Sequence, residues 1–394
     1  MKLYRNLSEA VVVTLKTIFE DNKYADKVLE KTLKQNPKWG ARDRRFIAET
    51  TYDIVRWYRY LLAVSGSKND DYWSLLGTWL IWKNIALPDW DQFKNLNVNS
   101  VKDKFQKEYP LPVRESIPDW LDELGNTELP SRWAKEIKSL NNEAEVVLRA
   151  NTLKGDIDTI QKQLMEDGIE TTINSKFQNA LILNKRMNVF GSQSFKQGLF
   201  EVQDVGSQLI APFLRAEPGM RVVDACAGAG GKTLHLSALM QNKGRVVAMD
   251  TEGWKLDELK KRAKRAGANN IEAKVIENSK TIKRLTSSAD RLLLDVPCSG
   301  LGVLKRNPDA KWKLSPDYIS KVKTIQQQIL SEYATMVKTG GMLVYSTCSI
   351  LPSENEEQVK RFLNSNTSFE LIDENHCWPS DGFDGFYMAL IKKK

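Results

Sequence analysis

The sequence predicts an α/β fold for the second half of the chain, a doubly wound parallel sheet preceded by helices and a small mixed region. Short apolar, β-branched runs recur there, as buried parallel strands require: 220–226, 244–250, 271–277, 291–297 and 342–348. Amphipathic segments at 232–240, 255–267 and 318–337 separate these runs, and strand–helix alternation is typical of a doubly wound sheet. Two final runs, 369–373 and 386–393, predict one closing antiparallel hairpin.

The first two hundred residues predict two further domains, since 394 residues exceed one ordinary domain. Apolar residues at helical spacing in 7–21, 42–64 and 72–88 predict an all-helical module, and the polar stretch 89–114 predicts a connector. From residue 117 helical patterns mix with short alternating runs, which predicts a small α+β domain. The expected domains are 1–114, 115–199 and 200–394.

Composition narrows the class of protein. The net charge of +8 and the isoelectric point near 9.0 favour a polyanionic partner such as nucleic acid. The chain contains no run of eighteen apolar residues, so we expect no membrane span, and the first residues lack a secretory cleavage site. Four scattered cysteines and two histidines supply a metal site poorly, so we expect no bound metal. The same cysteine usage favours the reducing cytoplasm. We also expect a monomer.

The segment DACAGAGGKT, which runs from Asp224 to Thr233, joins the first strand of the sheet to the next helix. Its small residues let backbone amides approach a ligand, and Asp250, which ends the second strand, can accept hydrogen bonds from ribose hydroxyls. A P-loop needs glycine where Cys226 stands, and a dinucleotide site needs a third glycine where Thr233 stands. An adenosylmethionine site is favoured over these and over a tight turn without a ligand.

Two cysteines follow neighbouring strands, Cys298 in DVPCSG and Cys348 in STCS. In an open α/β sheet both strand ends face the crevice where ligands bind. Methylation of cytosine carbon-5 needs a thiolate that adds to carbon-6, an acidic group at the ring nitrogen and a helper for elimination. Asp295 can supply the acidic group. The alternative is that both cysteines fill the core; two thiols at adjacent strand ends favour catalysis, but the chemistry alone does not choose the nucleophile.

Four motifs between Phe200 and Val359 resemble those of the RNA 5-methylcytosine methyltransferases of the RsmB and Nop type. They are FEVQDVGSQL, DACAGAGGKT, DVPCSGLGVLKRNPDAKW and YSTCS with PSENEEQV. Upstream, GARDRRFIAETTYDIVRWYRYL is similar to the NusB-like helical domain of bacterial members, and 117–169 to their small RNA-binding domain. The resemblance implies a Rossmann-like class I fold, S-adenosyl-L-methionine as cofactor and RNA, most specifically 16S rRNA, as substrate.

The resemblance also assigns roles by position. Cys348 becomes the nucleophile and Cys298 assists release of the product. The family's acid near the adenine falls at Asn278 or Glu277, and its alanine–proline pair in the loop is Gly228–Ala229 here, which predicts a more flexible loop. The implied cofactor contacts are Cys226, Ala227, Gly228, Ala229, Gly230, Gly231, Lys232, Asp250, Asn278 and Asp295.

Three rival functions stay open. A tRNA cytosine methyltransferase would use the same chemistry, an RNA-binding assembly factor could carry a decayed site, and a DNA methyltransferase would use Cys298 as its nucleophile. The helical module is expected to direct the protein to RNA and to contribute no chemistry. A basic loop after the Pro-Cys turn is expected to touch RNA phosphates, with Trp312 for stacking: Lys305, Arg306, Lys311 and Lys313.

Overall fold

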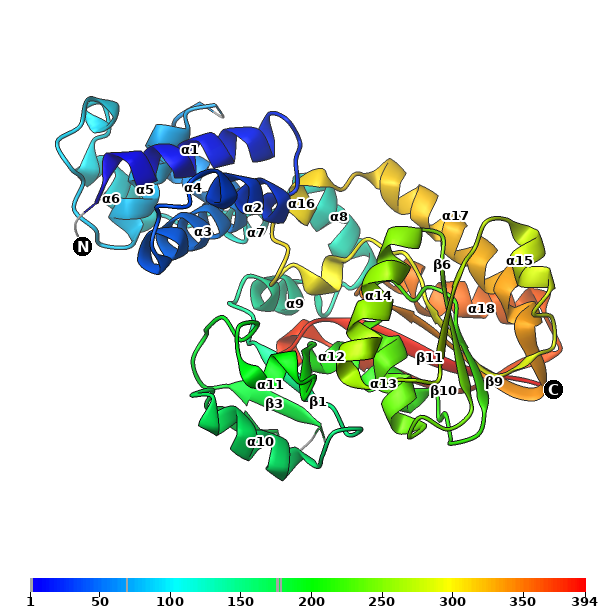
Figure 1. Ribbon diagram of the computed structural model, residues 1–394. Helices are drawn as coiled ribbons and strands as arrows, with labels where there is room; N and C mark the ends of the chain where they lie inside the picture. Colours follow the sequence, from blue (N-terminus) through cyan, green and yellow to red (C-terminus); the bar gives the residue numbers. More distant parts are fainter. Residues whose placement is uncertain (1–2, 69, 175–176, 178) are drawn as a thin grey trace. The chain divides into compact units, whose positions relative to one another are not determined.

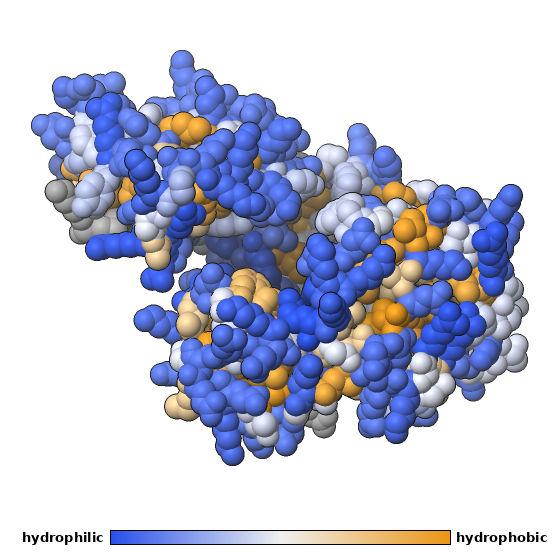
Figure 2. Space-filling model, viewed as in Figure 1, coloured by the Kyte–Doolittle hydropathy of each residue, from blue (hydrophilic) through white to orange (hydrophobic). Residues whose placement is uncertain are grey.

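The computed structural model describes residues 3–68, 70–174, 177 and 179–394, and it divides into two compact units. The first contains Met1–Asn142 and Leu304–Ser315, and the second contains Glu143–Val303 and Pro316–Lys394. Figure 1 shows helices in the first unit and two sheets with their helices in the second. In Figure 2 hydrophilic side chains cover most of the visible face of each unit. No helix in the described part of the chain is long and apolar enough to cross a membrane.

The first unit is helical, as the spacing of apolar residues predicts. Val11, Leu15 and Ile18 of the first helix are at most 1% exposed, because residues three or four apart share one helix face. The run 42–64 forms two helices that meet at Trp57. The helices are α1 (Arg5–Phe19), α2 (Ala25–Gln35), α3 (Ala41–Arg56), α4 (Tyr58–Ser65), α5 (Tyr72–Trp82), α6 (Val98–Phe105), α7 (Leu111–Arg114), α8 (Asp119–Glu128), α9 (Trp133–Leu140) and α16 (Ala310–Lys313).

The polar stretch 89–114, which the sequence predicts as a connector, forms helices in the structure. It contains α6 and α7, and Phe93 and Val101 are buried against the other helices. The ring of Phe105 stacks on Trp82 with centroids 6.0 Å apart. A few well-spaced apolar residues anchor the segment, and the lysines and asparagines around them hide this pattern.

The prediction that the basic loop touches RNA is wrong for Lys305, Lys311 and Trp312, because Leu304–Ser315 packs within the helical unit. Lys311 is 1% exposed, and its Nζ donates to the carbonyl of Arg56 at 2.8 Å. The indole of Trp312 donates to the carbonyl of Val55 at 2.8 Å. Both carbonyls lie at the C-terminal end of α3, where a cation and an N–H donor stabilise the helix. Lys305 is also buried.

The second unit begins with a small antiparallel sheet whose strand order is β2-β3-β1-β4. Helix α10 (Ile157–Glu166) packs on it through Ile160 and Leu164, and the short α11 (Gln193–Lys196) precedes the last strand. The strands are β1 (Val147–Ala150), β2 (Thr171–Ile173), β3 (Ala180–Leu183) and β4 (Phe200–Val202).

The large sheet has the order β10-β11-β9-β8-β5-β6-β7, which confirms the predicted doubly wound fold. Strands β5 to β9 are parallel, and β10 and β11 form the predicted antiparallel hairpin at one edge. The strands are β5 (Arg221–Asp224), β6 (Arg245–Asp250), β7 (Ile271–Val275), β8 (Ala289–Asp295), β9 (Val337–Thr347), β10 (Phe369–Cys377) and β11 (Phe386–Lys393).

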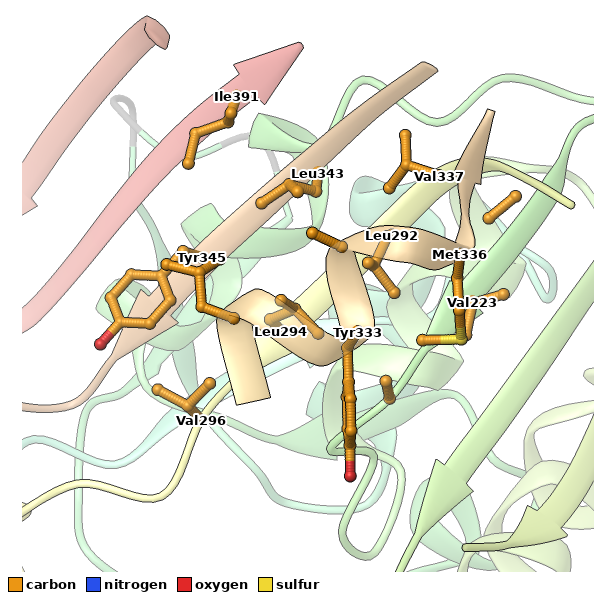
Figure 3. Packing of buried hydrophobic residues seen from close by; sticks show 14 of the residues in the cluster. Val223, Leu292, Leu294, Val296, Tyr333, Met336, Val337, Leu343, Tyr345 and Ile391 are labelled. Atoms are coloured by element: carbon orange, nitrogen blue, oxygen red, sulfur yellow. The ribbon is translucent and has the colours of Figure 1, made fainter. Parts of the chain in front are cut away.

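Helices cover both faces of this sheet. Neighbouring residues in a strand point to opposite faces, so Val223 packs with Tyr333 of α17, while Val222 packs with Leu236 of α13. Figure 3 shows the first of these layers, in which strand residues such as Val223 and Leu292 lie beside Tyr333 and Met336. The helices are α12 (Val205–Phe213), α13 (Gly231–Leu239) and α14 (Gly253–Ala266) on one face, and α15 (Ser279–Lys283), α17 (Pro316–Tyr333) and α18 (Glu356–Ser365) on the other.

Candidate cofactor loop and thiol pair

The glycine-rich loop turns sharply between β5 and α13. Gly228 has φ +52° and Gly230 has φ +90°, backbone conformations that residues other than glycine rarely adopt. A Cβ at Gly230 would lie 2.6 Å from Cγ of Leu259, whereas a Cβ at Gly228 would meet nothing within 4 Å. The loop is therefore packed on its inner side at Gly230 and open at Gly228, which leaves room for a ligand to approach the backbone.

Asp250, at the end of β6, supports this loop. Its Oδ2 accepts a hydrogen bond from the Gly228 amide at 2.9 Å, and its Oδ1 accepts one from the Glu252 amide at 2.9 Å. Each carboxylate oxygen has a second lone pair, and the side chain is only partly buried. Asp250 can therefore still accept hydrogen bonds from a pair of ribose hydroxyls.

The other expected cofactor residues differ in their surroundings. Cys226 lies within the loop, and burial together with the carboxylates of Asp224, Asp295 and Asp250 raises the pKa of its thiol well above the usual value. Glu277 and Asn278 are exposed after β7. The Asn278 side chain caps α15 by accepting a hydrogen bond from the Lys280 amide at 2.9 Å.

Asp224 is a buried carboxyl beneath the loop. Its Oδ2 accepts a hydrogen bond from the Thr233 hydroxyl at 2.7 Å. Burial raises the pKa of Asp224 to about 7, against the effect of the Thr233 hydrogen bond and with a contribution from the charge of Asp295. This carboxyl therefore titrates near neutral pH.

Lys232 and Asp295 connect the cofactor loop to the cysteine turns. The Lys232 Nζ lies 2.6 Å from Asp295 Oδ2, and the Ser346 hydroxyl donates to Asp295 Oδ1 at 3.1 Å. Burial opposes the charge of Lys232, but the nearby Asp295 carboxylate and, to a smaller extent, Cys348 raise the pKa of the amine. A charged lysine and a carboxylate thus lie between the loop and the thiols, where they could hold a polar ring.

The two cysteines lie in contact. Cys298 and Cys348 have their Sγ atoms 3.2 Å apart, although fifty residues separate them in the chain. The hydrogen bond to Cys348, burial and the charges of Cys348 and Glu354 raise the pKa of Cys298 well above its usual value. These effects favour the protonated form of the Cys298 thiol.

Glu354 holds the two cysteine turns together, and the sequence did not single it out. Its side chain is fully buried in the short turn Pro352–Glu354. Its carboxylate accepts hydrogen bonds from the Ser299 amide at 2.8 Å, the Ser299 hydroxyl at 2.5 Å and the Ser349 hydroxyl at 2.5 Å. Gln326 of α17 adds a fourth at 3.0 Å. Because Ser299 follows Cys298 and Ser349 follows Cys348, one carboxylate fixes the spacing of both thiols.

The expected site residues thus form one connected set at the carboxyl ends of β5, β6, β8 and β9, with Asn278 and Glu277 on the exposed loop after β7. The PSENE segment contains Glu354, and its appearance among the motifs was the available signal for that residue. Within the described residues no cluster of three His, Cys, Asp or Glu side chains could hold a metal ion.

The doubly wound sheet, with its glycine-rich turn and an acid at the end of the next strand, defines a Rossmann-like class I methyltransferase. Two family models match the chain: 16S rRNA methyltransferase RsmB/F over residues 211–391, and the ferredoxin-like domain of RsmF/B-like methyltransferases over 117–190. The chain belongs to the RsmB/F family of 16S rRNA methyltransferases. This confirms the resemblance and supports S-adenosyl-L-methionine as the cofactor.

Individual relatives are consistent with membership of this family. The chain is 35% identical over 316 residues to a probable ribosomal RNA small subunit methyltransferase B of Synechocystis sp., a match that covers 73% of this chain and 69% of the relative. It is 33% identical to ribosomal RNA small subunit methyltransferase B of Vibrio vulnificus, over 75% of this chain and 73% of the relative. The crystal structure of the protein PH0851 is similar over the whole of both chains, with a TM-score of 0.83 and 25% identity.

Proposed function

We propose that this rRNA methyltransferase methylates carbon-5 of a cytosine in 16S rRNA through a covalent adduct between Cys348 and carbon-6 of the base. The observation that carries the proposal is the thiol pair, whose two sulfur atoms lie 3.2 Å apart; the contact and burial also raise the pKa of Cys298 well above its usual value. A single buried cysteine would have no such partner, and methyl transfer to an already nucleophilic atom would not need one.

The residues around the pair fit the steps of this chemistry. Cys348 adds to carbon-6 as a thiolate, and the proton shared by Lys232 and Asp295 is donated to the ring nitrogen that gains the electron pair. The nitrogen returns this proton to the pair when the adduct breaks down. Carbon-5 thereby becomes the nucleophile. Bound S-adenosyl-L-methionine supplies the electrophilic methyl group. The loop amides and Asp250 would hold its methionine and ribose portions.

Cys298 then serves the release of the product. Its pKa is raised first by its hydrogen bond to Cys348 and also by the charge of that residue. Once the Cys348 sulfur is bonded to carbon-6, it carries no negative charge, so its contribution to the raised pKa disappears and Cys298 loses its proton to solvent more readily. The Cys298 thiolate removes the proton from carbon-5, the electrons of that bond re-form the double bond, and Cys348 leaves as a thiolate.

The experiment that tests the proposal is bisulfite sequencing of total RNA from cells with and without this gene. We expect one or more 16S rRNA cytosines to lose protection from deamination when the gene is deleted, and protection to return with the gene. Loss of protection only in tRNA would assign the rival substrate. Unchanged cytosines in all RNA would contradict carbon-5 methylation.

The role of the helical unit at the start of the chain is also proposed here. We propose that the helical part is NusB-like and directs the enzyme to its RNA, and that the protein acts as a monomer in the cytoplasm. The helical unit takes in the segment Leu304–Ser315, which immediately follows the Pro-Cys region in the chain. A truncation that removes 1–114 would therefore leave Lys311 and Trp312 without the α3 carbonyls that they bind.

A further inference from the structure

The glycine-rich loop is in contact with the small antiparallel sheet. Arg149 of β1 is 3% exposed, and its Nη1 donates to the carbonyl of Gly231 at 2.6 Å. The same nitrogen donates to the side-chain oxygen of Gln203, and the Gln203 amide donates to the Ser207 hydroxyl at 2.9 Å. A guanidinium from outside the methyltransferase sheet therefore holds the carbonyl at the first turn of α13.

A second guanidinium holds the same loop two residues earlier. Arg262 of α14 donates through Nη1 to the carbonyl of Ala229 at 2.8 Å and through Nη2 to Glu201 at 2.9 Å. Glu201 belongs to β4 of the small sheet and is 4% exposed. Its other oxygen accepts a hydrogen bond from Arg265 at 2.5 Å. The carboxylate thus orients Arg262 towards the loop.

The small sheet and α14 pack too closely to allow easy adjustment. A Cβ at Gly198, which has φ +72°, would lie 2.1 Å from the carbonyl oxygen of Arg265. The Asn151 side chain donates to the carbonyl of Ala266 at 2.8 Å. The guanidinium of Arg265 stacks on the ring of Phe195 at 3.9 Å. The strands that carry Arg149 and Glu201 are therefore fixed relative to α14.

These contacts control a part of the backbone that has little stiffness of its own. Gly228 and Gly230 have wide conformational freedom. The carbonyl of one residue and the amide of the next lie in one plane. A fixed Ala229 carbonyl therefore fixes the Gly230 amide, and a fixed Gly231 carbonyl fixes the Lys232 amide. The Gly230 amide donates to the Ala227 carbonyl at 2.9 Å and so shapes the turn, and the Lys232 amide lies in the first turn of α13.

We infer that Arg149 and the Glu201–Arg262 pair are positioning residues for the cofactor loop, so that the small domain sets the affinity for S-adenosyl-L-methionine. The inference concerns cofactor binding and does not depend on which RNA atom is methylated. Its alternative is that these charges only join the small domain to the methyltransferase sheet.

Arg265 provides the matched control. Arg262 and Arg265 both lie on α14 and both bind Glu201, but only Arg262 also donates to a loop carbonyl. The full chain would be compared with Arg262→Met, Arg265→Met and Arg149→Met by calorimetric titration with S-adenosyl-L-methionine. Hydrogen exchange of the peptides that cover 225–234 would be measured without cofactor, and urea unfolding would report stability.

We expect Arg262→Met and Arg149→Met each to weaken binding about tenfold, the effect of losing one charge-assisted hydrogen bond. Exchange in 225–234 should accelerate in both. Arg265→Met should change affinity by less than about twofold and leave loop exchange unchanged, even if it lowers the urea midpoint as much as Arg262→Met. Equal weakening by Arg262→Met and Arg265→Met, or unchanged loop exchange in Arg262→Met, would overturn the inference.

Discussion

The two halves of the candidate site are held in different ways. On the cofactor side, at the ends of β5 and β6, the proposed ligand-binding groups are backbone amides and Asp250, and Asp250 also holds the loop through the Gly228 amide. On the thiol side, at the ends of β8 and β9, the reactive groups are side chains, and one buried carboxylate holds both turns through several hydrogen bonds.

This difference indicates how each half responds to change. A binding loop with several separate supports should lose affinity in steps when one support is removed. The proposed nucleophile and the proposed base of the elimination step lie 3.2 Å apart, so a small displacement of either turn should abolish turnover while binding persists. Variants on the two sides should therefore separate cofactor affinity from turnover.

The largest expected effect is that of Cys348→Ala. Removing the nucleophile should lower methyl transfer to rRNA by at least about 10⁴-fold, because the remaining thiol, Cys298, serves elimination and not addition. Affinity for S-adenosyl-L-methionine should stay within about twofold, since the loop does not need this thiol. Methyl transfer is measured with labelled methyl groups, and cofactor affinity is measured by calorimetry. Cys377→Ala, at the end of β10, is the control cysteine; turnover retained by Cys348→Ala would remove the nucleophile assignment.

Glu354→Gln should come next. The amide of glutamine presents two hydrogens where Ser299 and Ser349 also present donors, so the two turns should separate. We expect turnover to fall about 100-fold, the scale of one or two lost hydrogen bonds to a charge, with cofactor affinity unchanged. Single-turnover rates on rRNA and calorimetry check this. A parallel loss of cofactor affinity would show that the two halves are not supported independently.

Asp250→Ala should show the opposite pattern. Loss of its hydrogen bonds should weaken cofactor binding by about 1.5–3 kcal/mol, roughly 10- to 150-fold. At saturating S-adenosyl-L-methionine the rate should recover most of its original value. Unchanged affinity would place the ribose elsewhere, and a rate that saturation does not restore would contradict the separation of the two halves.

The smallest expected effect is on the pH dependence of stability. The pKa of Asp224 is about 7 in the folded chain and near the usual 3.8 when unfolded. The folded state therefore binds more protons between these values, and the contribution of Asp224 to the unfolding free energy falls as pH rises from 4 to 7. Asp224→Asn should flatten this part of the profile. Urea titrations from pH 4.5 to 8 would test it, and equal slopes for both proteins would contradict the raised pKa.

Much of the sheet was predictable because its strands are continuous apolar runs, and because the reactive residues follow those runs directly. Asp250, Cys298 and Cys348 each stand at or just after a strand end, and the topology of parallel strands brings such ends to one edge. Sequence motifs then located the loop and both thiols without knowledge of the distances between them.

The supports were not predictable, because their partners lie far apart in the chain. Glu354 binds Ser299, fifty-five residues away, and Arg149 binds Gly231, eighty-two residues away. The burial of Lys311 also has no local signal. A lysine in a basic loop normally remains in solvent, and its hydrogen bond to the Arg56 carbonyl at the end of α3 explains its position. Such pairings depend on tertiary packing.

Cys348 is proposed to attack the base and Cys298 to complete elimination, and Cys298→Ala tests these two roles most directly. Cys348 should still attack the base in this variant while elimination stalls. Incubation with rRNA and S-adenosyl-L-methionine should give a protein–RNA band that survives denaturing electrophoresis, depends on the cofactor and disappears in the double variant with Cys348→Ala. A band formed by Cys348→Ala alone, and none by Cys298→Ala, would reverse the two roles and contradict the account.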